Sequence, residues 1–350
     1  MFKCLFSPIL AMHFDVSMPI ALLAVTIAAI YLSGKVEKKL KATFEEREFK
    51  VKDAVMLVAA ICVAVSVMAF VPQMAVMVVF LFAYSTLLYI FTYIFSDVRK
   101  TTARLFCTAF IIVSFLAATF SLYFKDSLNA LTIYGAAAFY CLCGFSFITL
   151  IYEEGLRNLK ERWYLAVMPP SLFLILYIFY NQTSVWFPYL LNIYGLVFAV
   201  LIVLYLGSLF TWKTSIIFAG LLTIADIILV LVTRAMVSAA THVSGLRLPI
   251  MVTLPTIPQI IAEWGVVYMS LGLGDFFFAG LIAVQTYKKF GVNLAILSAS
   301  AMAASFFIFE ALILNFEVKS FPGTLMIICG WLPIMLYKSL ISGKSIKEKN

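Results

Sequence analysis

Ser215-Ile-Ile-Phe-Ala-Gly-Leu-Leu-Thr-Ile-Ala-Asp226-Ile-Ile-Leu-Val-Leu-Val232 is an apolar run that contains one charged residue, Asp226. Because a helix needs about 20 mostly apolar residues to cross the hydrocarbon layer, this run predicts a membrane span. The next apolar run includes residues 268–280, Tyr-Met-Ser-Leu-Gly-Leu-Gly-Asp-Phe-Phe-Phe-Ala-Gly, and carries one carboxylate, Asp275. A carboxylate inside the membrane costs free energy and therefore marks a candidate functional site.

The composition of the whole chain agrees with these two runs. Hydrophobic residues make up 64% of the chain and charged residues 12%, with a mean hydropathy of +1.06. A soluble domain is about half apolar and about a quarter charged. The composition therefore predicts an all-α, polytopic transmembrane helical bundle, an integral multi-pass protein embedded in the lipid bilayer.

Eleven apolar runs have the length of a span, and we expect about nine to eleven of them to cross the membrane. They are residues 16–33, 54–71, 74–95, 103–124, 129–152, 163–180, 185–207, 215–233, 264–286, 292–314 and 321–342. Between the first two, residues 35–53 alternate in charge and predict a solvated or interfacial helix.

The positive charges follow the loops of this division. With the N-terminus outside, the inside loops hold 20 of the 25 Lys and Arg residues. Cytoplasmic loops are enriched in Lys and Arg, so the asymmetry predicts a cytoplasmic C-terminus. Because the net charge of +8 comes from loops, it does not indicate a nucleic-acid partner. Cysteine and histidine spacings match no zinc site, and we expect no metal or cofactor.

Asp226 and Asp275 are expected near the midpoints of neighbouring antiparallel spans, where they can face each other. Two adjacent carboxyls cannot both ionise cheaply, so one keeps its proton. Such a pair can activate a water and protonate a leaving nitrogen, which is the chemistry of aspartic peptidases. A proton- or cation-coupled transporter would use the same pair. A third acidic residue, Glu310, is expected near the outer end of its span, where it can snorkel to the headgroups.

Four elements carry a resemblance to a known family. Gly272-Leu273-Gly274-Asp275 matches the Gly-x-Gly-Asp signature of the presenilin and signal peptide peptidase family of intramembrane aspartyl proteases. Asp226 occupies the place of the family's first aspartate, with Ala225 where the family has tyrosine. The family's Pro-Ala-Leu element corresponds here to Pro322-Gly323-Thr324, followed by Leu325, and residues 247–255 resemble the connection before the second catalytic span. The resemblance covers residues 215–342 and departs from the usual nine spans, since seven runs precede Asp226 where five are expected.

The resemblance implies roles for residues around the pair. Gly272 and Gly274 would let a neighbouring span or a substrate backbone approach Asp275, although small residues also serve ordinary helix packing. The segment with Leu248, Ile250 and Val252 would be an extended piece that accepts an unwound substrate as an added strand, or else a loop packed on the bundle. Pro322 would break the start of the last span near the pair.

These patterns together predict an intramembrane aspartyl endopeptidase of the Gly-x-Gly-Asp type, which cuts transmembrane segments or remnant signal peptides. The alternatives are the coupled transporter and an inert relative that binds membrane helices without cutting them. We divide the chain into an N-terminal span with its charged cytoplasmic segment (1–53), a transmembrane scaffold (54–208) and a catalytic region (209–350). The last residues, Lys-Glu-Lys-Asn, match no endoplasmic-reticulum address, which favours a prokaryotic cell membrane. Substrate identity and any accessory subunit stay open.

Overall fold

The protein is described by a computed structural model that covers residues 13–43, 48–68, 70–124, 131–155, 162–262, 265–316, 318 and 321–347. Within these residues the chain forms twelve α-helices and four short strands. Ten of the helical elements are long and apolar enough to cross a membrane. The fold class predicted from composition, an all-α polytopic bundle, is therefore confirmed.

The elements have the following bounds. The helices are α1 (Ser17–Thr43), α2 (Val51–Met68), α3 (Gln73–Ile94), α4 (Lys100–Tyr123), α5 (Leu131–Gly155), α6 (Trp163–Tyr180), α7 (Leu191–Leu209), α8 (Trp212–Ile227), α9 (Ala235–Ser244), α10 (Leu273–Phe290), α11 (Val292–Phe316) and α12 (Gly323–Lys347). The π-helical turns η1 (Trp186–Leu190) and η2 (Ile228–Val232) precede α7 and follow α8. The strands are β1 (Met251–Pro255), β2 (Ile261–Ala262), β3 (Gly265–Val266) and β4 (Tyr268–Gly272).

Ten of the eleven predicted spans correspond to one long helical element each, and the remaining one, residues 264–286, forms strands β3 and β4 before α10. Ten of these elements meet the length and composition of a span, and α10 is the exception because it carries Asp275, Lys288 and Lys289. The largest differences in bounds are at α1 and α10. Helix α1 continues to Thr43, ten residues past the predicted end of the first span, because the charged residues after Gly34 are good helix formers and Val36 and Leu40 are buried. Residues 44–47 of the predicted interfacial helix lie outside the described part of the chain.

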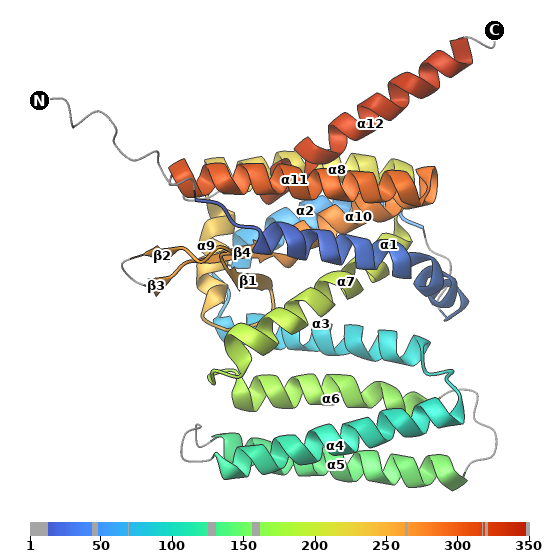
Figure 1. The fold of residues 1–350 in the computed structure, drawn as a ribbon, viewed down its shortest axis with the longest axis vertical. Helices are drawn as coiled ribbons and strands as arrows, with labels where there is room; N and C mark the ends of the chain where they lie inside the picture. Colours follow the sequence, from blue (N-terminus) through green and yellow to red (C-terminus); the bar gives the residue numbers. More distant parts are fainter. Residues whose placement is uncertain are drawn as a thin grey trace, which may run out of the picture.

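The helices are stacked in layers along the long axis of the molecule (Figure 1). Helices α4 and α5 lie at one end, followed by α6, α3 and α7, and α8, α11 and α12 lie at the other end. Helix α1 packs between these groups, against α7, α10 and α11. Helix α2 packs against α8, so part of the region predicted as a scaffold lies beside the predicted catalytic region in space.

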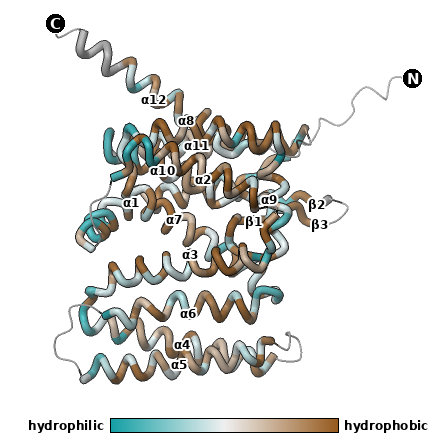
Figure 2. The backbone as a smooth tube through the Cα atoms, turned by 180° about the vertical axis from the view of Figure 1, so that it is seen from behind, coloured by the Kyte–Doolittle hydropathy of each residue, from teal (hydrophilic) through white to brown (hydrophobic). Residues whose placement is uncertain are grey.

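Charged side chains from distant parts of the sequence meet at one side of the bundle. Lys288 at the end of α10 pairs with Glu37 of α1 at 2.8 Å, and Lys39 of α1 pairs with Asp97 after α3. At the same ends, Arg104 of α4 pairs with Glu154 of α5. Figure 2 shows hydrophilic residues gathered where α1 and α10 end. We refer to this side as the charged face; it contains the loops that the charge count assigns to the inside.

Candidate active site

The sequence predicts Asp275 near the middle of a span, and this prediction is wrong. Residues 268–272 form strand β4, and α10 begins only at Leu273, so Asp275 lies in the first turn of the helix. Strand β4 pairs antiparallel with β1, with Ser270 opposite Thr253. The sequence Leu-Gly-Leu-Gly before the aspartate is a poor start for a helix, because glycine loses more conformational entropy than other residues.

The two aspartates nevertheless lie at matched depth. Thirteen residues separate Asp226 from Lys213 at the start of α8, and thirteen separate Asp275 from Lys288 near the end of α10. At 1.5 Å per residue both carboxylates are about 20 Å along their helices from the charged face. The carboxylates of Asp226 and Asp275 contact adjacent residues at the start of α12, Thr324 and Gly323 respectively, and line the same cavity. The predicted pair is therefore assembled in space, although off-centre along both helices.

Asp226 is held by the start of α12. Thr324 donates two hydrogen bonds to its Oδ2 atom, one from Oγ1 at 2.6 Å and one from the backbone N–H at 3.3 Å. The first N–H groups of a helix have no partner within the helix, and its N-terminus attracts negative charge. Asp226 itself is 7% exposed. The predicted Pro322-Gly323-Thr324 element thus lies directly at the first aspartate.

Asp275 is positioned by two glycines. Its Oδ2 atom lies 3.5 Å from the position that an added Cβ of Gly272, the residue that caps α10, would take. The same carboxylate packs against Gly323, where an added Cβ would lie 2.5 Å from Oδ1 and 2.9 Å from Oδ2. No side chain fits at Gly323 unless Asp275 moves. The residue that brings α12 onto the pair is therefore Gly323.

The cavity beside the pair has a volume of about 390 Å³. It is lined by Asp226, Asp275 and Glu310, by β4, and by residues of α9, α11 and the start of α12. None of its lining residues in the described part of the chain is Lys, Arg or His. Within the described residues, no three His, Cys, Asp or Glu side chains are grouped so that they could hold a metal ion.

The expectation that Glu310 reaches the headgroups is wrong. Its side chain is 1% exposed and lines the cavity of the two aspartates. Neither carboxylate oxygen of Glu310 has a hydrogen-bond partner. Because α10 and α11 pack antiparallel, the start of α10 and the last turns of α11 lie at the same end of the bundle. The acidic residue in the next apolar run was the sequence signal for this third carboxylate.

The remaining predicted site residues take different positions. Gly274 is exposed, and an added Cβ there would meet nothing within 4 Å, so no neighbouring helix packs on it. Leu273 is buried, and Leu325 is half-buried outside the cavity. Leu248 and Val252 are buried in the core, and Ile250 packs against it. From β1 it is Met251 that lines the cavity of the aspartates.

Strand β1 is covered on the edge that faces away from β4. Asn192 of α7 accepts the N–H of Thr253 at 2.7 Å, and its Nδ2 donates to the Thr253 carbonyl at 2.5 Å. Thr253 and Ser270 are therefore a non-hydrogen-bonded pair of the ladder, and their hydroxyls lie 2.9 Å apart. The N–H and C=O groups of Ser270 consequently point outward, along the edge of β4 that leads to Asp275.

Sequence reasoning missed the residues that hold this hairpin. The hydroxyl of Tyr84 donates to the Pro249 carbonyl, and Trp186 Nε1 donates to the Arg247 carbonyl. Asp15 accepts the N–H of Ile257 at 2.7 Å and also accepts N–H groups at the start of α1. Only Asp15 had a local signal, since an aspartate just before a helix is a typical N-cap.

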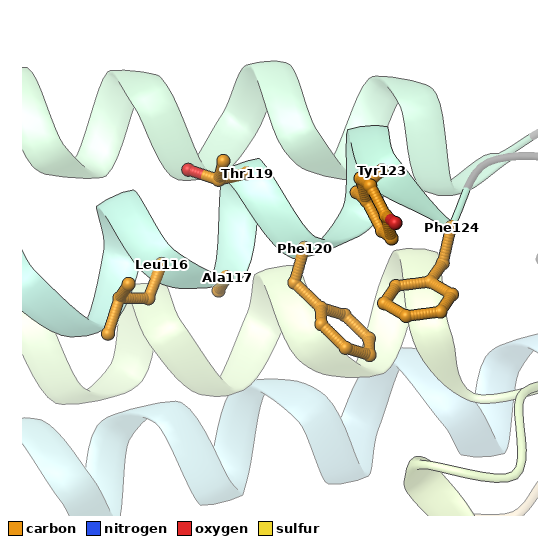
Figure 3. Close-up of a pocket in the computed structure, with 6 residues that line it drawn as sticks. All are labelled: Leu116, Ala117, Thr119, Phe120, Tyr123 and Phe124. Carbon is orange, nitrogen blue, oxygen red and sulfur yellow. The ribbon is translucent and has the colours of Figure 1, made fainter.

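Two other hollows do not resemble a site. One, of about 560 Å³, is an apolar surface near the end of α4 that is lined by Leu116, Phe120 and their neighbours (Figure 3). Another, of about 420 Å³, lies among α1, α3 and α7 and contains no ionisable side chain among its lining residues. Both fit surfaces that contact lipid tails. The cavity with the three carboxylates is the candidate active site.

Two comparisons with known proteins were negative. No protein-family model matches the chain, and no curated protein matches it.

Proposed function

We propose that this protein is an intramembrane aspartyl endopeptidase that resembles presenilins and signal peptide peptidases. One observation carries the proposal: Asp226 and Asp275 come from different helices, lie at matched depth and line one cavity without a cation. Paired carboxyls in that arrangement suit acid–base activation of a water. The cavity of about 390 Å³ is large enough for a short peptide segment together with a water molecule.

The two carboxyls would divide the work of hydrolysis. The ionised carboxyl takes a proton from the water, whose oxygen bonds to the carbonyl carbon of the substrate. The protonated carboxyl gives its proton to the substrate as the C–N bond breaks, and the products are a new carboxyl and a new amine. The pair titrates as a unit, so the acid and base roles belong to the dyad. Thr324 would fix the orientation of Asp226 throughout.

The outer edge of β4 is the natural place for the substrate backbone. A helical segment must unwind before its peptide bonds can be attacked, and its freed N–H and C=O groups then need partners within the membrane. Ser270 offers such groups, whereas those of Thr253 are already bonded to Asn192. We therefore propose that the substrate strand pairs with β4 instead of β1. A substrate strand on β4 would run toward Asp275.

Two departures from the family pattern have a structural counterpart. Gly323 replaces the alanine of Pro-Ala-Leu, and the Asp275 carboxylate fills the space that a Cβ would take. Seven helices precede α8 in the described chain where the family has five. The α4–α5 hairpin, which lies at the far end of the stack, would account for the two additional spans (Figure 1).

The test is cleavage in lipid vesicles. Purified protein is reconstituted with a labelled transmembrane peptide, beside Asp226→Asn, Asp275→Asn and the matched control Asp97→Asn, whose side chain is 60% exposed at the charged face. We expect cleavage by the native protein and the control and none by the two site variants. Ion flux that depends on both aspartates, without cleavage, would instead establish a transporter. Binding of the peptide with neither activity would establish an inert relative.

We also propose a prokaryotic cell membrane as the location, with the charged face and the C-terminus in the cytoplasm. The loops rich in Lys and Arg support this orientation. Tags at both ends of the chain, probed from outside intact cells, test it. Labelling of the N-terminal tag alone is the expected result, and labelling of the C-terminal tag would reverse the orientation.

A further inference from the structure

Glu310 is a buried carboxylate that the proposed dyad does not use. It is 1% exposed, its two oxygens lack hydrogen-bond partners, and it lines the same cavity as Asp226 and Asp275. A buried polar group without a partner costs free energy, more so when it is charged. A folded protein can retain a buried group with this free-energy cost when the group binds a ligand.

Within the described part of the chain, no cation lines the cavity beside this carboxylate. None of the described lining residues is Lys, Arg or His. Asp15 lies on the segment that meets the end of α11 through the hydrogen bonds of His13 with Asn315, and it carries a charge of the same sign as Glu310. Asp15 is satisfied by backbone N–H groups of Ser17, Met18 and Ile257 and does not donate to Glu310. Since no described residue at the cavity can pair with Glu310, we look for its complement in the molecule that enters the cavity.

We propose that Glu310 is a specificity-determining residue that binds a lysine side chain of the substrate close to the scissile bond. This inference rests on the proposed function, since it concerns the choice of segment that the dyad cuts. An ammonium group at Glu310 would give this unpartnered buried carboxylate an ion pair. A lysine near the end of a membrane span also costs less free energy than a lysine at the bilayer centre.

The position of Glu310 indicates where that lysine lies. Eighteen residues separate Glu310 from Val292 at the start of α11, which begins next to the charged face. At 1.5 Å per residue, Glu310 is about 27 Å along its helix, compared with about 20 Å for the aspartates. The lysine would therefore lie on the side of the scissile bond that faces away from the charged face.

Matched peptides test this inference. A transmembrane peptide carries lysine or norleucine, which has the same carbon chain without the ammonium group, at each of three positions on either side of the cut. We expect the native protein to have a kcat/KM at least tenfold higher for lysine than for norleucine at one of these positions. Glu310→Gln should bring the ratio close to one. Glu310→Lys should reverse it, favouring a peptide with glutamate there.

The control is Glu37→Gln, the same substitution at the charged face, where Glu37 pairs with Lys288 at 2.8 Å. It should keep the native lysine preference. Equal cleavage of lysine and norleucine peptides by the native protein would overturn the role of Glu310 and leave the protease intact. If no peptide is cleaved, the proposal of a protease is overturned, and peptide binding then tests the role of Glu310. Tighter binding of the lysine peptide, lost in Glu310→Gln, would support it, and equal binding would refute it.

Discussion

Buried carboxylates occur at both ends of this molecule, and the two groups have opposite surroundings. Glu153 at the end of α5 is 1% exposed, accepts a hydrogen bond from Arg162 Nε at 3.0 Å and another from the Tyr164 hydroxyl. Hydrogen bonding to Glu153 holds the pKa of Arg162 above its usual range. Asp226, Asp275 and Glu310 line a cavity that has no basic side chain among its described lining residues.

This difference distinguishes Glu153, which has a structural role, from the three cavity carboxylates, which are available for chemistry. Glu153 links α5 to the start of α6, and Arg162 also donates to the Val98 carbonyl before α4, so the ion pair ties three helices together. The three cavity carboxylates form few links between helices, apart from the hydrogen bond that Thr324 of α12 donates to Asp226 of α8. A neutralised carboxylate stabilises its surroundings, whereas an unneutralised one stays able to bind a proton, a water or a cation. The following predictions test this contrast.

The largest effect is expected for the aspartate pair. Asp226→Asn and Asp275→Asn should each lower kcat by about 10⁴-fold, and the double variant should lose no more, because the two act as a unit. Neither should lower the thermal unfolding temperature in detergent, since asparagine has the size of aspartate and its side-chain oxygen still accepts hydrogen bonds. Additive losses, or unfolding of either variant, would contradict the contrast.

The ion pair at the other end should behave in the opposite way. Arg162→Ala leaves Glu153 buried without its cation and should cost about 3–5 kcal/mol of unfolding free energy. The double variant Glu153→Gln with Arg162→Gln should recover most of this loss, because no buried charge remains. Chemical unfolding monitored by tryptophan fluorescence measures both. An Arg162→Ala variant as stable as the native protein would show that the pair is not structural.

Gly323 offers a test of geometry. Gly323→Ala places a Cβ within 3 Å of the Asp275 carboxylate and should displace it, lowering kcat by about 10²-fold. Gly144→Ala on α5 is the control, because an added Cβ there meets nothing within 4 Å. Single-turnover cleavage rates distinguish the two. Native rates in Gly323→Ala would mean that the carboxylate can shift without loss.

Asn192 should have a smaller effect that is confined to the hairpin. Asn192→Ala leaves the N–H and C=O of Thr253 without their side-chain partner, at a cost of about 1–3 kcal/mol. Hydrogen exchange should rise along β1 and β4 and stay unchanged in α4 and α5. Uniform protection across the hairpin would show that Asn192 does not hold the strand.

The smallest expected effect is on the stability of the cavity. Glu310→Met replaces an unpartnered carboxylate by an apolar side chain of similar length and should raise the unfolding free energy by about 1 kcal/mol. A thermal shift in detergent measures it, beside Glu153→Met, which should lower stability. Destabilisation by both substitutions would indicate that Glu310 has a structural partner.

The sequence by itself determined the membrane helices. All predicted spans except residues 264–286 became one long helical element each, because backbone groups in lipid must be satisfied within their own segment and apolar length therefore decides the outcome locally. The sequence also determined that two aspartates lie equally far from a lysine, since Lys213 and Lys288 are each thirteen residues away. Both results depend only on distances along the chain.

Only the tertiary structure decided what surrounds the aspartates. Whether residues 268–272 become helix or strand depends on pairing with β1, and β1 depends on Asn192 from α7. Likewise, Glu310 is buried because of what packs around the end of α11, and Gly323 matters because α12 begins against Asp275. These features arise from contacts between segments far apart in sequence, and local composition carries no record of which segments will meet.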